Sequence, residues 1–222
     1  MSTGLILEGV VGTGKSTLFR HLQDHPAFVS REAKLALPET YTERAIEHLE
    51  VKDLEASLLL LTRITDIVGG LNRTFSESKF GRGDHAELAL AFLLERFHLT
   101  HAAMFNEGRF AAYRSVDEVL RFLGAKLVVC VLDDAAFPER IATTRRERNQ
   151  LWNDYLDERI ASRTATMPRE EVDRRVVAHY VAQQKAMLAM ARQSLLPTLE
   201  IDTTRGDWLM YAEQAIRFWG LV

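Results

Sequence analysis

A glycine-rich segment near the start of the chain has the residue types and spacing of a phosphate-binding loop. It matches the pattern G-x-x-x-x-G-K-[ST] with these consecutive residues: Gly9, Val10, Val11, Gly12, Thr13, Gly14, Lys15, Ser16 and Thr17. Glycines let the backbone wrap tightly, so that successive N–H groups converge on phosphate oxygens. We expect Lys15, as an exposed loop cation, to contact the β- and γ-phosphates, and the Ser16 hydroxyl to ligate Mg²⁺. The segment predicts a site for a nucleoside triphosphate, with ATP and Mg²⁺ as ligands; the alternative is a glycine-rich turn that matches by chance.

Two carboxylates and an arginine follow later apolar runs and could act on a second substrate. Glu39 comes just after the run 34–37, and Glu95 and Arg96 come directly after the run 88–94. Because ligands of an open parallel sheet collect outside the carboxyl ends of its strands, we expect these side chains at one site. Glu39 is the candidate base for an acceptor hydroxyl, Glu95 could hold Mg²⁺ through water, and Arg96 could neutralise the acceptor or the transferring group. The structural alternatives are a surface glutamate that opens a helix and a Glu95–Arg96 ion pair.

An arginine-rich stretch could form a mobile lid over the phosphates. Its members are Arg140, Arg145, Arg146 and Arg148. Phosphoryl transfer places negative charge on equatorial oxygens, and an arginine that closes over them stabilises the reaction. Arg145 is therefore a candidate catalytic residue, and Arg146 and Arg148 are candidate nucleotide contacts. Because Glu139 and Glu147 are interleaved with the arginines, a solvated charged helix face remains the alternative.

Other residues with reactive side chains give weaker signals. Asp133 and Asp134 follow an apolar run and could be Mg²⁺ ligands, although the strand before Glu95 fits that role better. His98 and His101 could share a helix face, but no further metal ligands are suitably spaced, so packing or surface roles are favoured. The single cysteine, Cys130, lies inside an apolar run and is interpreted as a small buried hydrophobe.

Apolar runs alternate with helical patterns along the chain, and this alternation predicts which elements position the candidate site. The expected strands are 5–7, 34–37, 88–94, 127–132 and 198–201. The expected helices are 16–22, 54–73, 116–123 and 172–195. Strands that are apolar throughout indicate a parallel sheet covered on both faces, with the segment 138–196 capping one end as helices. An apolar stripe is interpreted as core: Val176, Val177, Tyr180, Val181, Met187 and Leu188.

Composition restricts the class of protein. The chain has 222 residues, 47% of them hydrophobic, and a net charge of −3, which disfavours a dedicated nucleic-acid binder. The apolar stretch at the N-terminus stops at Glu8 and lacks a basic region before it, and no run approaches the ~20 residues of a membrane span. We therefore expect a cytoplasmic protein without membrane or nucleic-acid partners, and the apolar segment 54–71 could form a homodimer interface.

Four segments together resemble the deoxynucleoside kinase and thymidylate kinase family. They are Leu7-Glu8-Gly9 at the phosphate-binding loop (P-loop), 37–40 (LPET), 94–97 (LERF), and the strand, helix and arginine series of 131–148. The resemblance covers most of the chain, and only the P-loop is specific by itself. It implies an α/β P-loop NTPase fold of three layers, with a central five-stranded parallel sheet and a helical lid. It also implies a single kinase domain over residues 1–222, with the lid and a helical insertion at about 138–196.

Three functions agree with these features. The first is transfer of the γ-phosphoryl group of ATP to a nucleoside, a nucleoside monophosphate or a related small acceptor. The second is a P-loop kinase that acts on a non-nucleotide hydroxyl compound, such as a metabolite or an antibiotic. The third is a regulatory ATPase without an acceptor. A P-loop alone does not distinguish them.

Overall fold

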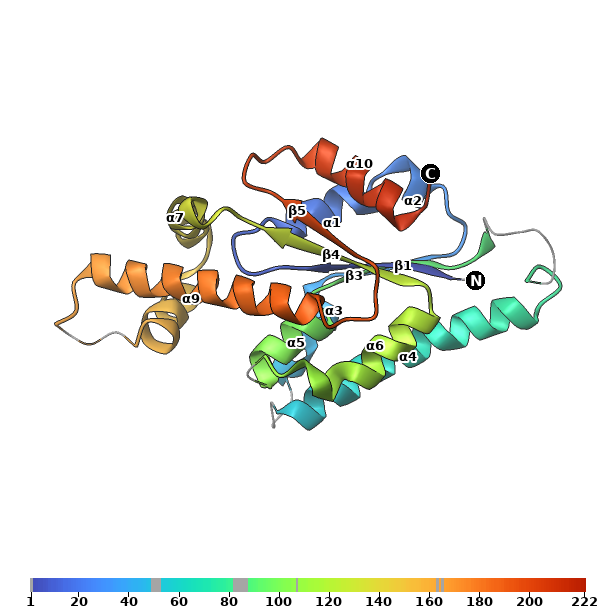
Figure 1. Ribbon diagram of the computed structural model, residues 1–222, viewed down its shortest axis with the longest axis horizontal. Coiled ribbons are helices and arrows are strands. Elements are labelled where there is room, and N and C mark those ends of the chain that lie inside the picture. Colours follow the sequence, from blue (N-terminus) through green and yellow to red (C-terminus); the bar gives the residue numbers. More distant parts are fainter. Residues whose placement is uncertain (1, 49–52, 82–87, 107, 163, 165) are drawn as a thin grey trace.

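The computed structural model describes residues 2–48, 53–81, 88–106, 108–162, 164 and 166–222. Five parallel strands form one sheet in the order β2-β3-β1-β4-β5, so that the strand before the P-loop lies at its centre (Figure 1). The strands are β1 Thr3–Glu8, β2 Lys34–Leu37, β3 Ala91–Glu95, β4 Ala125–Val131 and β5 Thr198–Asp202. All five expected strands are present, although β3 begins at Ala91 rather than at residue 88.

Helices cover both faces of the sheet and give a three-layer α/β fold. On one face lie α1 (Lys15–Gln23), α2 (Pro26–Val29) and α10 (Trp208–Trp219). On the other face lie α4 (Leu54–Glu77), α5 (His98–Phe105), α6 (Arg114–Phe122) and part of α9 (Arg169–Ala191). The shorter helices α3 (Glu39–Thr42), α7 (Phe137–Glu147) and α8 (Gln150–Tyr155) lie at the carboxyl end of the sheet.

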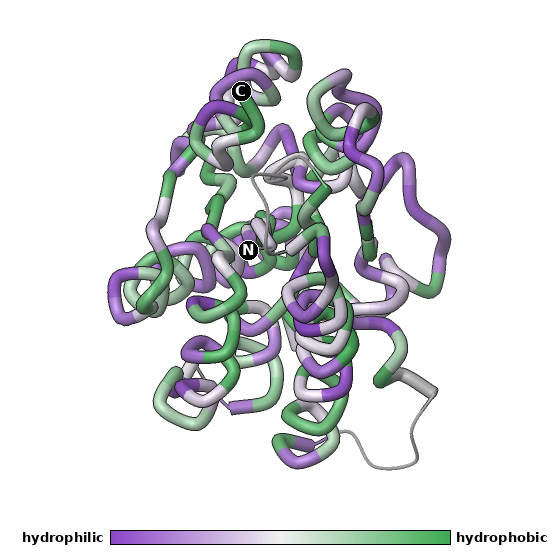
Figure 2. The backbone as a smooth tube through the Cα atoms, turned by 90° about the vertical axis from the view of Figure 1, so that its right-hand side faces the viewer, coloured by the Kyte–Doolittle hydropathy of each residue, from purple (hydrophilic) through white to green (hydrophobic). Residues whose placement is uncertain are grey.

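The two-sided cover explains why the strands are apolar throughout. Leu5, Leu7 and Leu93 face α1 and α10, while Ile6 and Leu94 face the α4–α6 side, and all five are fully buried. Hydrophilic and hydrophobic residues alternate around the turns of the helices, as expected where each helix buries one face (Figure 2). Burial raises the pKa of the Cys130 thiol to about 12, so this cysteine is an inert part of the core, as its sequence context predicts.

The segment 138–196 has two roles rather than the single capping role expected from the sequence. The helices α7 and α8 and the first turns of α9 extend beyond the carboxyl end of the sheet and form the lid (Figure 1). The rest of α9 runs back beneath the sheet, where Met187 and Met190 are buried in the core. One continuous helix therefore connects the lid to the core. The sequence Gly81-Arg82-Gly83 is typical of a loop, and its last two residues lie outside the described part of the chain.

The long helix α4 packs on α6 and leaves part of its apolar surface uncovered. Leu59, Ile67 and Leu71 are 49%, 59% and 49% exposed. The homodimer suggested by this segment stays a prediction. In the part of the chain that the structure describes, no helix is both long and apolar enough to cross a membrane.

Candidate active site

The P-loop joins the central strand β1 to the N-terminus of α1. Gly9 and Gly14 have positive φ values of 145° and 75°, which residues with a side chain rarely adopt. A Cβ atom at Gly9 would lie 2.6 Å from the Cys130 carbonyl oxygen, and one at Gly14 would overlap the Trp208 ring. Both glycines are therefore required, and the loop turns its backbone towards the cavity at the end of the sheet.

Lys15 lies inside this loop. Its ammonium group donates a 2.8 Å hydrogen bond to the Val10 carbonyl, and the side chain is buried rather than exposed as expected from the sequence. Thr13 donates to the same carbonyl at 2.8 Å and closes the loop. Burial, together with the positive charge of Arg96, lowers the pKa of Lys15 to about 8. A bound phosphate would offset this shift, so the site is built to receive an anion.

Ser16 and Glu95 meet beside the P-loop. The Ser16 hydroxyl donates a 2.5 Å hydrogen bond to Glu95 Oε1, although the two residues are 79 positions apart. Glu95 is nearly fully buried at the end of β3, whereas Ser16 lines the cavity. Hydroxyl and carboxylate oxygens are the donors that Mg²⁺ prefers, so this pair fits a magnesium ion next to the phosphates.

Arg96 lies at the centre of a group of charged residues, on the side of the cavity where the sequence predicts the acceptor (the acceptor side). Its guanidinium contacts Glu39 Oε2 at 2.9 Å and Glu43 Oε2 at 2.7 Å, and Arg44 contacts the other Glu39 oxygen at 2.9 Å. The backbone of Arg96 has a positive φ of 51°, a conformation that non-glycine residues rarely hold outside functional sites. The sequence did not single out Glu43 or Arg44.

The pKa of the Glu39 carboxyl group depends on the charged residues around it. Burial acts to raise the pKa of this carboxyl, but the positive charges of Arg96, Arg44 and Lys15 outweigh it, so the pKa lies below its usual value. The backbone N–H of Glu39 also donates to Glu95 Oε2 at 3.3 Å. Glu39 and Glu95, the carboxylates predicted to act on the acceptor and on Mg²⁺, are thus joined directly.

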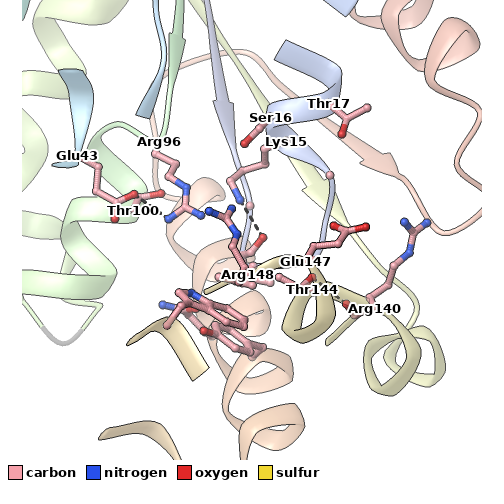
Figure 3. Close-up of a pocket in the computed structure, with 18 of the residues that line it drawn as sticks. Lys15, Ser16, Thr17, Glu43, Arg96, Thr100, Arg140, Thr144, Glu147 and Arg148 are labelled. Carbon is pink, nitrogen blue, oxygen red and sulfur yellow. Dashed lines mark hydrogen bonds and ion pairs between the residues drawn. The ribbon is translucent and has the colours of Figure 1, made fainter. Parts of the chain in front are cut away.

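The lid arginines divide into two groups. Arg140 and Arg148 line the cavity, and Figure 3 shows the Arg148 guanidinium directed into it. Arg145 instead pairs with Asp157 at 2.9 Å and Asp173 at 3.3 Å inside the lid, and is not a lining residue. Arg146 does not line the cavity and donates to Thr143 at 3.0 Å. The structure therefore brings Arg148, and not Arg145 or Arg146, towards the P-loop.

A cavity of about 620 Å³ lies between the P-loop, the acceptor-side charges and the lid. Side chains that the sequence did not assign to it, most of them aromatic or polar, complete its wall: Trp152, Tyr155, His179, Tyr180, Gln183, Met187 and Trp208. Tyr180 and Met187 were expected only in the core. Their spacing on α9 is that of a buried stripe, which is also the spacing of a cavity wall, so periodicity could not separate the two.

The loop after β5 supports the P-loop, a contact that no sequence pattern indicates. The Thr203 hydroxyl donates to the Thr13 carbonyl at 2.8 Å. Arg140 donates to the carbonyls of Thr203 and Thr204, both at 3.1 Å. These contacts connect the first lid arginine to the far side of the P-loop.

The residues that gave weaker signals in the sequence, two aspartates and two histidines, pair with other residues of the fold. Asp133 accepts a hydrogen bond from the Ala135 N–H at 2.8 Å, and Asp134 pairs with Lys185 at 2.9 Å. His98 pairs with Asp117 in the core, and His101 is also fully buried. Among the described residues, no group of three or more histidine, cysteine or carboxylate side chains could hold a metal ion.

Glu8 lies behind the cavity and fixes one of its walls. One carboxylate oxygen accepts the N–H groups of Phe97 at 3.0 Å and Leu99 at 2.9 Å, and the other accepts the Thr100 hydroxyl at 2.5 Å. A negative charge at the start of α5 is favourable because the helix dipole is positive there. Glu8 therefore acts as a structural cap that places Thr100 in the cavity wall.

Solved structures share this fold. The YorR protein from Bacillus subtilis, solved in complex with phosphorylated GDP, matches with a TM-score of 0.51 and 14% identity over 97% of this chain and 95% of that chain. Thymidylate kinase from Ehrlichia chaffeensis matches with a TM-score of 0.46 and 11% identity over 97% and 98% of the two chains. No protein-family model and no curated protein matches the sequence. The sheet order and the likeness to the YorR protein confirm the predicted three-layer α/β fold with a central five-stranded parallel sheet.

Proposed function

We propose that the chain is an ATP-dependent phosphotransferase that moves the γ-phosphoryl group to a nucleoside, a nucleoside monophosphate or a related small acceptor. The observation that carries the proposal is the position of Arg96. This residue lines the same cavity as Lys15 and Ser16, and it is bonded to the acceptor-side carboxylates Glu39 and Glu43. Arg96 thus lies between the P-loop, which would bind the phosphate donor, and the carboxylates that would bind the phosphate acceptor.

The donor half of the site is the P-loop. Its backbone and Lys15 would bind the phosphates of ATP, while Ser16 and Glu95 would hold Mg²⁺, Glu95 through water. When bound, the ion would neutralise charge on the phosphate oxygens. Arg148 is our candidate for the contact with the transferring group, because it is directed into the cavity. A catalytic role for Arg145 stays a prediction, and it would require the ion pairs of Arg145 with Asp157 and Asp173 to break.

The acceptor half would bind and orient a hydroxyl or phosphate oxygen near Glu39. The oxygen would form a bond to the γ-phosphorus as the bond to the β–γ bridging oxygen breaks and ADP leaves; a hydroxyl proton would pass to Glu39. The lid wall favours an acceptor with a flat ring, because Trp152, Tyr155 and Tyr180 all line the cavity. Burial raises the pKa of the Tyr180 hydroxyl, so this side chain presents a neutral hydroxyl and an aromatic ring to the cavity.

The test measures ADP release with ATP alone and with ATP plus nucleosides, nucleoside monophosphates and non-nucleotide hydroxyl compounds. We expect release that depends on a nucleoside or a nucleotide. Dependence on a non-nucleotide compound would support the second function, and slow release that is the same with every acceptor would support a regulatory ATPase. Lys15→Met should abolish transfer, whereas Arg146→Ala, which changes an exposed lid residue outside the cavity, is the matched control.

A further inference from the structure

A chain of buried hydrogen bonds runs from α4 through α5 to the carboxyl end of β3. His101, on α5, contacts the Ser57 hydroxyl with Nδ1 at 2.7 Å and the Thr42 carbonyl with Nε2 at 2.6 Å. The Thr42 hydroxyl donates to the backbone carbonyl of Glu95, and the Ser57 hydroxyl also contacts the Tyr113 hydroxyl at 2.9 Å. His101, Thr42, Ser57 and Tyr113 have no exposed surface.

Chemistry fixes the direction of the two hydrogen bonds that the His101 ring makes. A carbonyl oxygen only accepts, so Nε2 of His101 must carry a proton and donate it to Thr42. In a neutral imidazole Nδ1 then accepts from the Ser57 hydroxyl. The Tyr113 hydroxyl has two neighbours, the Ser57 hydroxyl at 2.9 Å and the His101 backbone carbonyl at 3.2 Å, to which it donates. Burial lowers the pKa of His101 to about 4, in agreement with a neutral ring. From Ser57 through His101 to Thr42, each donor therefore acts towards Glu95.

The chain ends where the metal-side and acceptor-side carboxylates meet. Thr42 is the last residue of α3, the helix that begins with Glu39, and Glu43 follows it directly. Glu95 accepts the Thr42 hydroxyl on its backbone and the Glu39 N–H on its side chain. A shift of Thr42 would therefore move these carboxylates relative to Ser16.

We propose that His101 is a positioning residue that holds Thr42, and through Thr42 sets the place of the Glu95 carboxylate beside Ser16 and of Glu39 on the acceptor side. The proposal rests on the proposed function for the roles of Glu95 and Glu39. His101 itself touches neither ligand, and it acts through the Thr42 carbonyl. A merely structural His101 would contribute to folding energy and leave the metal site unaffected.

The two ring nitrogens can be replaced one at a time. The amide nitrogen of glutamine lies near the position of Nε2, so His101→Gln retains a donor for the Thr42 carbonyl. The shorter His101→Asn retains an acceptor near Nδ1 for Ser57 and loses the bond to Thr42. His98→Gln is the matched control, because His98 is a buried histidine on the same helix that pairs with Asp117 instead.

The experiment measures, for each full-length variant, the Mg²⁺ concentration that gives half-maximal ATP binding by calorimetry, and turnover with the best acceptor. We expect His101→Asn to raise the Mg²⁺ midpoint and lower turnover by about 10-fold, as for other residues that orient a ligand from behind. His101→Gln should stay within about 3-fold of wild type, and His98→Gln should leave the Mg²⁺ midpoint unchanged. Equal Mg²⁺ midpoints for the two His101 variants, or a shift that follows thermal stability in all three proteins, would overturn the proposal.

Two further measurements test the proposal if the His101 variants do not fold or if no phosphate acceptor is identified. If neither His101 variant folds, Thr42→Val should raise the Mg²⁺ midpoint while Thr42→Ser restores it, and an unchanged midpoint in Thr42→Val would reject the proposal. If the wild-type protein binds ATP with Mg²⁺ but transfers phosphate to no acceptor, the proposed function fails. The binding midpoint then still tests His101, because it requires no turnover.

Discussion

The Ser16 hydroxyl and the Glu95 carboxylate are joined by a 2.5 Å hydrogen bond across two adjacent strands of the sheet. Ser16 follows β1 through the P-loop, and Glu95 ends β3, which pairs with β1 so that Leu7 lies beside Glu95. This register brings a P-loop hydroxyl against a carboxylate that is far away in sequence. The pairing of the two strands therefore builds the proposed metal site.

Replacing this carboxylate should weaken the use of Mg²⁺. Glu95→Gln keeps the size of the side chain and an acceptor for Ser16 but removes the charge, so we expect the Mg²⁺ concentration needed for activity to rise by ~10-fold or more. The measurement is a Mg²⁺ titration of turnover at saturating ATP and acceptor. Asp133→Asn, just after strand β4 on the other side of β1, should behave as wild type; a larger effect there would move the metal site to β4.

Replacing Arg148 should affect turnover, whereas replacing Arg145 should affect stability. Arg148→Ala removes a guanidinium directed into the cavity, so turnover should fall by ~10²-fold with little change in ATP affinity or thermal stability. Arg145→Ala leaves the buried Asp157 with one fewer partner, and we expect a loss of about 3 kcal/mol in the free energy of unfolding. Steady-state kinetics and thermal unfolding of both variants distinguish the catalytic arginine from the structural one. A turnover defect in Arg145→Ala without a loss of stability would restore Arg145 as the catalytic arginine.

The sequence predicted the fold well because its strongest signals are local. The P-loop pattern needs only consecutive residues, and the apolar runs identify buried strands such as 127–132 whatever their neighbours are. The structure brings Glu39, Glu95 and Arg96 together, as the sequence predicts, because parallel strands end at one edge of the sheet. Each of these inferences uses residues adjacent in the chain and a general rule of sheet geometry.

The rest of the site depends on contacts between distant segments. Glu43 and Arg44 are part of the site only because Arg96 and Glu39 bind them, and Thr203 supports the P-loop from 190 positions away. Arg145 and Arg148 are arginines of the same short stretch of sequence. Only the ion pairs of Arg145 with Asp157 and Asp173 distinguish their roles. No local pattern carries that information.

The buried His101 should give the folding stability a defined dependence on pH. Its pKa is about 4 in the folded protein because burial opposes the charge and His98 adds repulsion, against a partial offset by the Thr42 carbonyl and Glu43. The unfolded chain binds this proton near pH 6.5, so between about pH 6.5 and 4 acidification favours unfolding, by up to about 3 kcal/mol at the lower limit.

Denaturant unfolding of wild type and His101→Gln across this range measures that contribution. The variant has no imidazole at this position, so the stability advantage of the wild type should shrink as the pH falls and be constant above about pH 7. Parallel stability curves for the two proteins would show that His101 does not titrate as its burial requires.

Glu39 and Glu95 are bonded neighbours, yet the proposed roles predict that they can be separated. Glu39→Gln should lower turnover by ~10²–10⁴-fold and leave the Mg²⁺ midpoint unchanged, because its carboxylate acts on the acceptor. The arginines that lower its pKa keep Glu39 ionised at neutral pH but make it a weak base. Its proton transfer should therefore accompany transfer of the phosphoryl group rather than precede it.

The measurement is the same Mg²⁺ titration. The control is Glu213→Gln, because Glu213 pairs with His25 on the α1–α10 side, away from the cavity. A shifted Mg²⁺ midpoint in Glu39→Gln together with an unshifted one in Glu95→Gln would exchange the two roles. If neither variant is impaired, the acceptor site lies elsewhere, and only the nucleotide site of the P-loop remains.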